Sequence, residues 1–292
     1  MTLLEKISNG DILLSDGAWG TFLQATGLKP GECPELWNVT RKNDIIRIAE
    51  AYIEAGSDII ETNSFGGSLF KLSQYGLGER VFELNKAAAA ISREAAGDSK
   101  HVAGSVGPTG KILIMGDVTE EELYDAFRDQ SVGLEAGGAD IIIIETMSAI
   151  DEASLAVRAV RENTKCIVIV TMTFEGSPDG EYRTMMGVSP GEMVTSMKEA
   201  GAHIVGSNCG NGIENMIGIV KEIRRVDSAI PVMIQANAGV PELIDGKTVF
   251  RESPEMMASF VPSLIEAGAN ILGGCCGTTP GHISAMKRMI SY

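Results

Sequence analysis

The sequence predicts a single (β/α)₈ barrel, because it contains a repeated helix-to-strand joint, enough apolar runs for eight strands, and no break in composition. The joint occurs four times, as EAGSDII (54–60), EAGGADIII (135–143), EAGAHIV (199–205) and EAGANIL (266–272). Glycine suits the left-handed position that ends a helix, and a run of β-branched residues is typical of a strand buried on both faces of a parallel sheet. Each joint therefore marks a helix that leads into a strand.

Four further apolar runs raise the number of expected strands to eight. They are ILLSDGA (12–18), HVAGSVG (101–107), CIVIVTMTF (166–174) and IPVMIQANA (230–238). Eight alternating strand and helix units favour a closed barrel, with a doubly wound open sheet as the alternative. Because no linker divides the chain, we expect residues 1–292 to form one domain.

Amphipathic helices fit the intervals between these strands. In residues 44–56, 121–137 and 214–226, apolar side chains recur at steps of three and four, as in a helix with one buried face. Segments 28–38, 176–187 and 242–252 read as longer loops that follow strands. We expect all three loops on one rim of the barrel.

The composition excludes some classes of partner. The chain has 24 Lys and Arg against 39 Asp and Glu, a formal net charge of −15 at pH 7, so nucleic acid and anionic membranes are poor partners. No apolar run reaches the roughly 18 residues of a membrane span, and the first ten residues lack the order of a signal peptide. We therefore expect a cytoplasmic protein.

Three of the five cysteines follow expected strands, at the barrel end where this fold places its chemistry. Cys209 ends the sixth strand, and Cys275 and Cys276 end the eighth, so one intervening strand separates them. Three soft thiolates favour zinc and leave a fourth position for water or substrate. Adjacent strand residues point to opposite faces, so the pair can share an ion only if the chain turns, which the glycines of GGCCG (273–277) permit.

Other interpretations of these residues stay open. The adjacent cysteines could form a strained disulfide, although a reducing compartment disfavours it. Cys33 and Cys166 are expected to be buried small side chains. His282, at the start of the last expected helix, is either a fourth ligand or a surface or capping residue, and we favour the surface or capping role.

Carboxylates also follow the expected strands. Asp16 and Glu145 end runs that are otherwise apolar, where an unpaired charge would be unfavourable, so each needs a cation or hydrogen-bond donors. Either a substrate or the rim itself could supply them, and we favour the substrate. Glu61 occupies a similar position, and the sequence favours neither role for it.

Read in order, several stretches resemble the homocysteine S-methyltransferase family, most closely the N-terminal homocysteine-binding module of cobalamin-dependent methionine synthases. They are LLSDGAWGT (13–21), IIETNSFGG (59–67), GSVGPTGKIL (104–113), ETMSAIDEA (145–153), GSNCGNG (206–212), NAGVP (237–241) and GGCCGTTPGHI (273–283). The resemblance implies a (β/α)₈ barrel and a zinc ion held by Cys209, Cys275 and Cys276. The residues that we expect around homocysteine are Asp16, Gly17, Ala18, Glu145 and Asn237.

The expected reaction follows from such a site. A thiol with a pKa near 8.5 is mostly protonated at neutral pH, and zinc would hold homocysteine as a zinc-bound thiolate that accepts a methyl group to give methionine. The ammonium of L-homocysteine would pair with Glu145. Its carboxylate would accept hydrogen bonds from backbone amides near Gly17 and Ala18.

The methyl donor is less determined than the acceptor. The sequence has no DxHxxG motif of a cobalamin module and ends at Tyr292, so we expect methylcobalamin or another methylcorrinoid to be supplied by a separate corrinoid protein. S-methylmethionine or a betaine is the alternative donor. A metal-dependent barrel lyase or aldolase would need a Schiff-base lysine or an oxygen-rich metal site, and we disfavour it.

Overall fold

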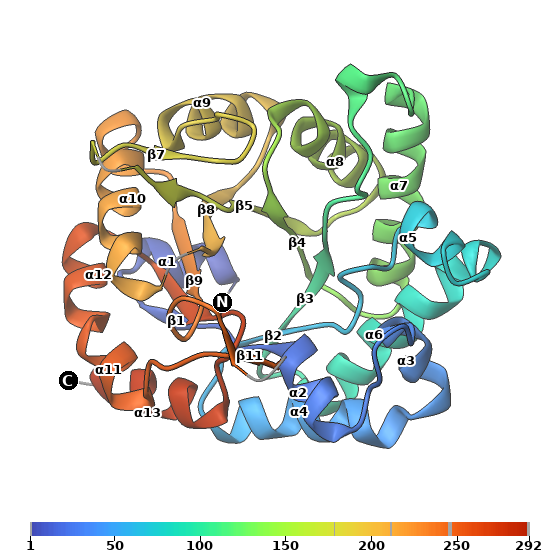
Figure 1. The fold of residues 1–292 in the computed structure, drawn as a ribbon, viewed down its shortest axis with the longest axis horizontal. Helices are drawn as coiled ribbons and strands as arrows, with labels where there is room; N and C mark the ends of the chain where they lie inside the picture. Colours follow the sequence, from blue (N-terminus) through green and yellow to red (C-terminus); the bar gives the residue numbers. More distant parts are fainter. Residues whose placement is uncertain (1, 178, 211, 245–246, 291–292) are drawn as a thin grey trace.

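The computed structural model, which describes residues 2–177, 179–210, 212–244 and 247–290, has eight parallel strands in one sheet that curves into a barrel (Figure 1). The order of the strands around the barrel is their order in the chain. This result confirms the predicted (β/α)₈ barrel. The strands are β1 (Leu13–Leu14), β2 (Ile59–Glu61), β3 (His101–Val106), β4 (Ile141–Met147), β5 (Ile167–Met172), β8 (Ile204–Cys209), β9 (Val232–Ala236) and β12 (Ile271–Gly274).

The first strand joins the two ends of the sheet. Leu13 and Leu14 pair with residues 271 and 272 of β12, and a single bridge joins Ser15 to Ile59 of β2. Asp58 strengthens this thin seam, since its amide donates to the Leu14 carbonyl at 2.6 Å and its carboxylate accepts from the Leu14 amide at 3.1 Å. The barrel therefore closes through one short strand.

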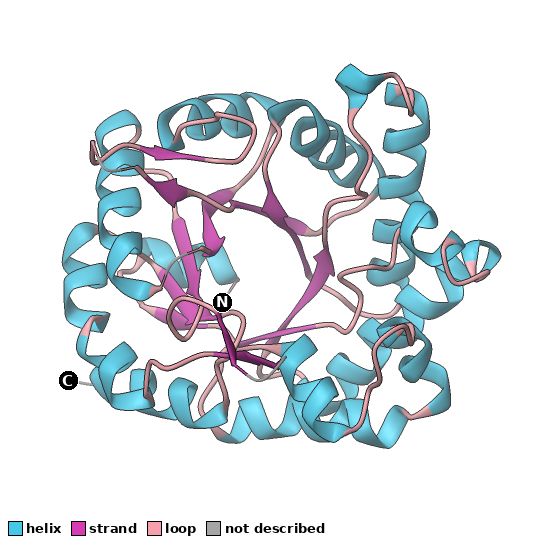
Figure 2. Ribbon diagram, viewed as in Figure 1, coloured by secondary structure: helices cyan, strands magenta, loops and turns pink. Residues whose placement is uncertain are grey.

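Helices surround the strands on the outside (Figure 2). The predicted helices at 44–56, 121–137 and 214–226 are confirmed as α4, α7 and α10. At the four repeated joints, Gly56, Gly138, Gly201 and Gly268 have φ between 102° and 109°, as the left-handed position requires. The outer helices are α4 (Lys42–Glu54), α6 (Val81–Ala96), α7 (Glu120–Ala136), α8 (Ile150–Asn163), α9 (Pro190–Ala200), α10 (Ile213–Val226), α11 (Pro254–Ser259), α12 (Val261–Ala267) and α13 (Pro280–Ile290).

The expected loops lie at the face where the strands end. Segment 28–38 holds η1 (Pro34–Leu36) and the start of α3 (Trp37–Thr40), while β6 (Glu175–Gly176) pairs with β7 (Tyr182–Arg183), and β10 (Glu242–Ile244) with β11 (Lys247–Val249). The hairpin strands β7 and β11 lie in front in Figure 1. The other short elements are α2 (Trp19–Thr26), α5 (Leu69–Ser73), η2 (Gly78–Arg80) and η3 (Leu113–Met115).

The interior of the barrel has two layers of different chemistry. The lower layer, which we call the apolar floor, is closed from below by Leu3 and Ile7 of α1 (Leu3–Ser8). Its strand residues are Leu13, Ile59, Ala103, Ile141, Ile143, Ile169, Ile204, Met233 and Ile271. Side chains on one face of a strand recur every second residue, so the next inward positions form a polar layer nearer the strand ends. That polar layer consists of Glu61, Ser105, Glu145, Thr171, Asn208 and Gln235.

None of the helices in the described part of the chain has both the length and the apolar character that crossing a bilayer requires.

Candidate functional site

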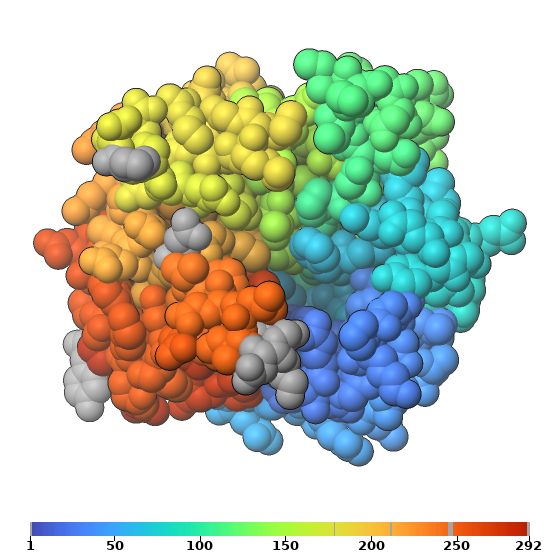
Figure 3. Space-filling view, in the orientation of Figure 1, coloured from blue at the N-terminus to red at the C-terminus, as the bar shows by residue number. Residues whose placement is uncertain are grey.

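A cavity of about 590 Å³ lies above the polar layer, at the carboxyl ends of the strands. The space-filling view shows a hollow near the middle of this face, between the first and last thirds of the chain (Figure 3). Segments 17–21, 61–66 and 274–276 line it, together with Glu145 and Cys209. The segments that resemble the methyltransferase family therefore converge on one cavity.

The three strand-end cysteines meet at this cavity. The sulfurs of Cys209 and Cys275 are 3.0 Å apart, and all three sulfurs, including that of Cys276, lie within 4.8 Å of one another. Zinc–sulfur bonds of about 2.3 Å in a tetrahedron place sulfurs roughly 3.8 Å apart, so the spacing suits one zinc ion. Hydrogen bonds from the other two thiols lower the pKa of Cys276 and so favour its thiolate form.

A tight turn directs both adjacent cysteines to the same side. The Thr278 amide donates to the Cys275 carbonyl at 3.1 Å, and Gly277 inside the turn has φ of 79°. A β-carbon on Gly274 would lie 2.3 Å from Oγ1 of Thr278, so this glycine serves close approach rather than the turn itself. The turn predicted from GGCCG is thus made by Gly277.

Two non-glycine residues at the site adopt the left-handed region. Thr146 has φ of 61° and Cys209 has φ of 59°, and no other non-glycine residue in the described ranges has positive φ. The pairing of β4 with β5 shifts register between Ile144 and Met147, so Thr146 lies at a bulge. Such conformations cost roughly 1–3 kcal/mol each and persist only where the surroundings hold them.

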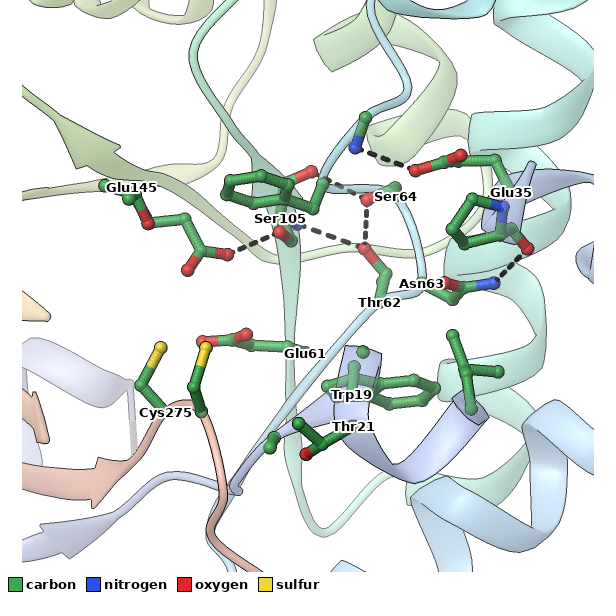
Figure 4. A pocket seen from close by; sticks show the side chains of 18 of the residues that line it. Trp19, Thr21, Glu35, Glu61, Thr62, Asn63, Ser64, Ser105, Glu145 and Cys275 are labelled. Atoms are coloured by element: carbon green, nitrogen blue, oxygen red, sulfur yellow. Dashed lines mark hydrogen bonds between the residues drawn. The ribbon is translucent and has the colours of Figure 1, made fainter. Parts of the chain in front are cut away.

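Glu145 projects into the cavity from β4 (Figure 4). Its side chain accepts hydrogen bonds from Oγ of Ser105 and, at 3.3 Å, from Nδ2 of Asn208. Burial raises the pKa of Glu145 to about 7, although the Ser105 bond acts in the opposite direction. A cation beside this carboxylate would favour its charged form.

Glu61 enters the cavity from β2, on the side where Cys275 lies (Figure 4). Gln235 Nε2 donates to its Oε1 at 2.6 Å. Burial raises the pKa of Glu61 well above its usual value, and the charges of Glu145 and Asp16 raise it further. Glu61 therefore lines the same cavity as Glu145.

The lining is short of positive charge. Of the described residues that line the cavity, Lys71 is the only lysine or arginine, against Glu35, Glu61 and Glu145. The contacts of Glu61 and Glu145 described above are to amide and hydroxyl groups. The cavity is therefore suited to a ligand with a positively charged group.

Asp16 lies behind the cavity wall instead of lining it. It is fully buried, and its Oδ2 accepts from Nε1 of Trp19 and from the amide of Glu61, both at 2.9 Å. Burial raises the pKa of Asp16 to about 6, against these hydrogen bonds. Asp16 thus holds in place Trp19 and Glu61, which do line the cavity.

Gly17 and Ala18 do line the cavity, ahead of the first turn of α2. A β-carbon on Gly17 would lie 2.7 Å from Oγ1 of Thr278, so only glycine fits this approach. The Ala18 amide donates to the same oxygen at 3.1 Å. Ala18 provides no capping side chain, and Gly20 and Thr21 of the first turn also line the cavity.

Asn237 lies outside the cavity lining. Its Nδ2 donates to the Gly210 carbonyl at 2.9 Å, directly after Cys209, and its buried Oδ1 has no partner in the described part of the chain. The structure therefore places Asn237 as a brace for the Cys209 loop, whereas the sequence placed it beside homocysteine.

His282, Cys33 and Cys166 have contacts or burial that fit structural roles. Nδ1 of His282 accepts from the Thr279 amide at 3.1 Å, and its Nε2 lies 2.9 Å from the Glu252 carbonyl, so the expected capping role is confirmed. Cys33 and Cys166 are buried as expected, and burial raises the pKa of each thiol to about 12.

The wall opposite the cysteines joins two loops. Oε1 of Glu35 accepts from the Gly66 amide at 2.7 Å, and Asn63 donates to the Pro34 carbonyl at 2.8 Å (Figure 4). These bonds fasten η1 to the loop after β2. Three aromatic side chains line this part of the cavity, namely Trp19, Phe65 and Tyr75.

Exposed apolar side chains follow the loops around the cavity mouth. We call them the apolar rim; Ile114, Met115, Met185 and Leu243 are between 75% and 85% exposed. They follow β3, β5 and β9 and so share the face that carries the cavity. The full set is Ile112, Ile114, Met115, Met185, Met186, Val240, Leu243 and Ile244.

From the sequence, no role in the site was assigned to Asn208 or Gln235. Both are polar residues at the carboxyl ends of apolar strands. Each lies an even number of residues after an inward-facing residue of the same strand, so its side chain also points inward. Gln235 is two residues after Met233, and Asn208 is four after Ile204. Counting that register from the apolar floor would have found them.

Comparisons with known proteins agree with this geometry. The family described as homocysteine S-methyltransferase matches residues 13–290. Methionine synthase of Mycobacterium tuberculosis is 32% identical over 309 residues, and that of Mycobacterium leprae is 30% identical over 307. Each match covers 99% of this chain and 25% of the relative, so the chain spans about a quarter of the length of these relatives.

Solved structures show the same fold. The metallated form of the homocysteine methyltransferase MmuM from Escherichia coli superposes with a TM-score of 0.80 at 23% identity, covering 98% of this chain and 99% of that one. Its oxidized form gives 0.79 at 25% identity, with 98% and 97% covered.

Proposed function

Because the chain belongs to the homocysteine S-methyltransferase family, we propose that residues 1–292 form a zinc-dependent barrel that methylates homocysteine to methionine. The observation that carries the proposal is the convergence of Cys209, Cys275 and Cys276 at a cavity walled by buried carboxylates. Three thiols match the preference of zinc for soft ligands, and the spacing of the sulfurs suits its tetrahedral geometry. Zinc held there would keep a substrate thiol deprotonated and nucleophilic at neutral pH.

The amino-acid end of homocysteine fits the acidic wall. We assign its ammonium to Glu145, which is buried, has no cationic partner among the described residues and has a raised pKa. Pairing with the ammonium would favour the ionised form of Glu145 and offset its burial. Glu61 is a second buried carboxyl group that lines the same cavity.

The carboxylate of homocysteine fits the first turn of α2. The amides at a helix amino terminus attract anions, and Ala18 provides no side chain that competes for them. The Ala18 amide already bonds Thr278, so Gly20 and Thr21 are better placed to donate than the Ala18 amide. Asp16 supports this arrangement by holding Trp19.

The proposed methyl donor is a methylcorrinoid carried by a separate protein. A corrin held by its own protein must approach an open face of the barrel, and the apolar rim offers exposed apolar surface around the mouth. The rim residues on the loops after β3, β5 and β9 would contact such a partner. Methyl transfer to the homocysteine sulfur would then occur at the cavity mouth.

A small onium donor is the second candidate, because aromatic side chains line the cavity. Trp19, Phe65 and Tyr75 lie in the same wall as Glu35, and aromatic faces beside a carboxylate can bind a sulfonium or quaternary ammonium. Phe174, a further aromatic residue near a strand end, is buried elsewhere. A corrinoid protein would approach the open face of the barrel, whereas a small onium donor would bind inside the cavity against its aromatic side chains.

A donor comparison tests the proposal. Zinc-loaded protein is incubated with homocysteine and, in parallel, methylcobalamin, S-methylmethionine or glycine betaine, and methionine is quantified. We expect methylcobalamin to support methionine formation and both onium donors to be much poorer; zinc-free protein and Cys276→Ala serve as controls. Turnover with an onium donor and none with methylcobalamin would reverse the donor assignment. If zinc-loaded protein does not bind homocysteine, the assignment of homocysteine as the methyl acceptor is wrong.

A further inference from the structure

Asn208 uses both ends of its side-chain amide within the candidate site. The side chain is fully buried. Its Oδ1 accepts from the Thr146 amide and from Oγ1 of Thr171, both at 2.8 Å. Its Nδ2 donates to Oγ1 of Thr146 at 2.7 Å and to Oε2 of Glu145 at 3.3 Å. No hydrogen-bonding capacity of this amide is left for solvent.

The same nitrogen also faces sulfur. Nδ2 of Asn208 lies 3.8 Å from Sγ of Cys209 and 4.0 Å from Sγ of Cys275, within reach of a weak N–H to sulfur hydrogen bond. The NH₂ group is therefore shared between two of the three proposed zinc ligands and the carboxylate assigned to the substrate ammonium. The carbonyl end of the amide, by contrast, accepts its hydrogen bonds from Thr146 and Thr171.

Asn208 also lies between the two left-handed residues of the site. It directly precedes Cys209 in β8, and two hydrogen bonds fasten it to Thr146 in β4. Left-handed conformations of non-glycine residues persist where the surroundings hold them. This amide is one of the contacts that hold Thr146 in that conformation.

We propose that Asn208 is a positioning residue that couples the three-cysteine site to Glu145, so that metal binding and recognition of the homocysteine ammonium depend on one amide. The inference rests on the proposed function. Groups that donate hydrogen bonds to metal ligands orient them and tune the metal, and their loss typically costs about 10- to 100-fold in metal affinity or activity. Asn208 does this for the sulfurs and orients Glu145 through the same NH₂ group.

The Asn208→Asp variant separates the two ends of the amide. Aspartate keeps an acceptor for the Thr146 amide and for Thr171, so the fold of the loop is retained, but it cannot donate to Glu145 or to the sulfurs. Thr171→Val is the matched control, because it removes one bond to Oδ1 and leaves the NH₂ group untouched. Asn208→Ala removes both the acceptor and the donor of the amide, and it reports whether the hydrogen bonds of Asn208 are needed for stability.

The measurements are zinc affinity by competition with a chromophoric chelator, homocysteine affinity of the zinc-loaded protein, and melting of the metal-free protein. We expect Asn208→Asp to weaken zinc binding by about 10- to 100-fold. Thr171→Val should change it by no more than roughly twofold, as for substitutions that leave the key contacts intact. With cobalt(II) in place of zinc, the thiolate charge-transfer bands should shift in Asn208→Asp and not in Thr171→Val.

A double-mutant cycle tests the coupling to Glu145. If Asn208 acts on homocysteine through Glu145, then Asn208→Asp should weaken homocysteine binding less in a Glu145→Gln background than in the wild type. Wild-type zinc affinity together with strictly additive effects on homocysteine would overturn the inference while leaving the proposed function in place. A wild-type protein that binds no zinc at Cys209, Cys275 and Cys276 would overturn both.

Discussion

The apolar floor and the polar layer are two residues apart along the same strands, yet their side chains have opposite energetics. Ile59 and Ile143 of the floor are fully buried among aliphatic neighbours, which stabilises the fold by roughly 1.5–3 kcal/mol for each such side chain. Glu61 and Glu145, the next inward residues, are buried too, and burial raises their pKa values instead. The lower half of the barrel interior therefore stabilises the protein, while the upper half holds buried carboxyl groups whose ionised forms a cationic ligand would favour.

The largest effect in the upper half of the barrel interior is expected for Cys276→Ala. Because the three sulfurs converge, we expect this variant to lose most of its zinc and its methyl transfer, with about one zinc per chain in the wild type. Metal analysis and the donor assay measure this result. The metal-free variant should melt close to the metal-free wild type, because Cys276 lies outside the floor. Full zinc occupancy in Cys276→Ala would exclude the three-thiolate site.

The matching change in the lower half is Ile143→Ala. Removing a fully buried aliphatic side chain leaves a cavity, so we expect the free energy of unfolding to fall by about 2–5 kcal/mol, measured by urea denaturation. The molecules that remain folded should still bind zinc with unchanged stoichiometry. Loss of zinc from folded Ile143→Ala would mean that the two layers are not separable.

A smaller effect is expected for Glu145→Gln, which keeps the size of the side chain and removes its charge. Homocysteine binding should weaken by roughly 1.5–3 kcal/mol, the range for a charge-assisted hydrogen bond, while zinc stays in place. Calorimetric titration of the zinc-loaded protein measures this change. Asp16→Asn should also weaken binding, but by less, because Asp16 acts through Trp19 and the Glu61 amide. Unchanged affinity in both variants would confine these carboxylates to a structural role.

A pH-dependent difference in stability between the wild type and Glu145→Gln is also expected. The pKa of Glu145 is raised from 4.5 to about 7, so between these pH values the folded protein retains a proton that the unfolded chain releases. Stability from this group is complete below pH 4.5 and is lost as pH rises toward 7. In metal-free protein without homocysteine, the wild type should therefore lose stability relative to the variant across this window. A constant difference in urea midpoints would contradict the raised pKa.

The same division explains what could be predicted from the sequence. Strands and helices follow from local patterns, and the runs at 101–107 and 166–174 contain β3 and β5. The convergence of Cys209 with Cys275 and Cys276 followed from strand order once a barrel was expected. The contacts within the polar layer did not, because they depend on which side chains meet across the barrel.

Two residues illustrate the limit. Asn208 lies within GSNCGNG (206–212), but its bond to the Thr146 amide depends on a bulge that period-two counting does not foresee. Asp16 was correctly expected to need hydrogen-bond donors, but it finds them in Trp19 and the Glu61 amide instead of in a ligand at the cavity surface. Local patterns thus predict the strands, whereas the partners of buried polar groups require the assembled barrel.

The short seam at β1 has a consequence for how the protein is made. Leu13 and Leu14 pair with residues 271 and 272, so the barrel cannot close until β12 has been synthesised. Contacts so distant in sequence form late, and the growing chain keeps an unpaired sheet edge until then. Cys275 and Cys276 leave the ribosome immediately after that strand. Closure of the barrel and assembly of the three-cysteine cluster therefore both wait for the last strand, and a nascent chain presents Cys209 without Cys275 and Cys276 until nearly all of the barrel has been translated.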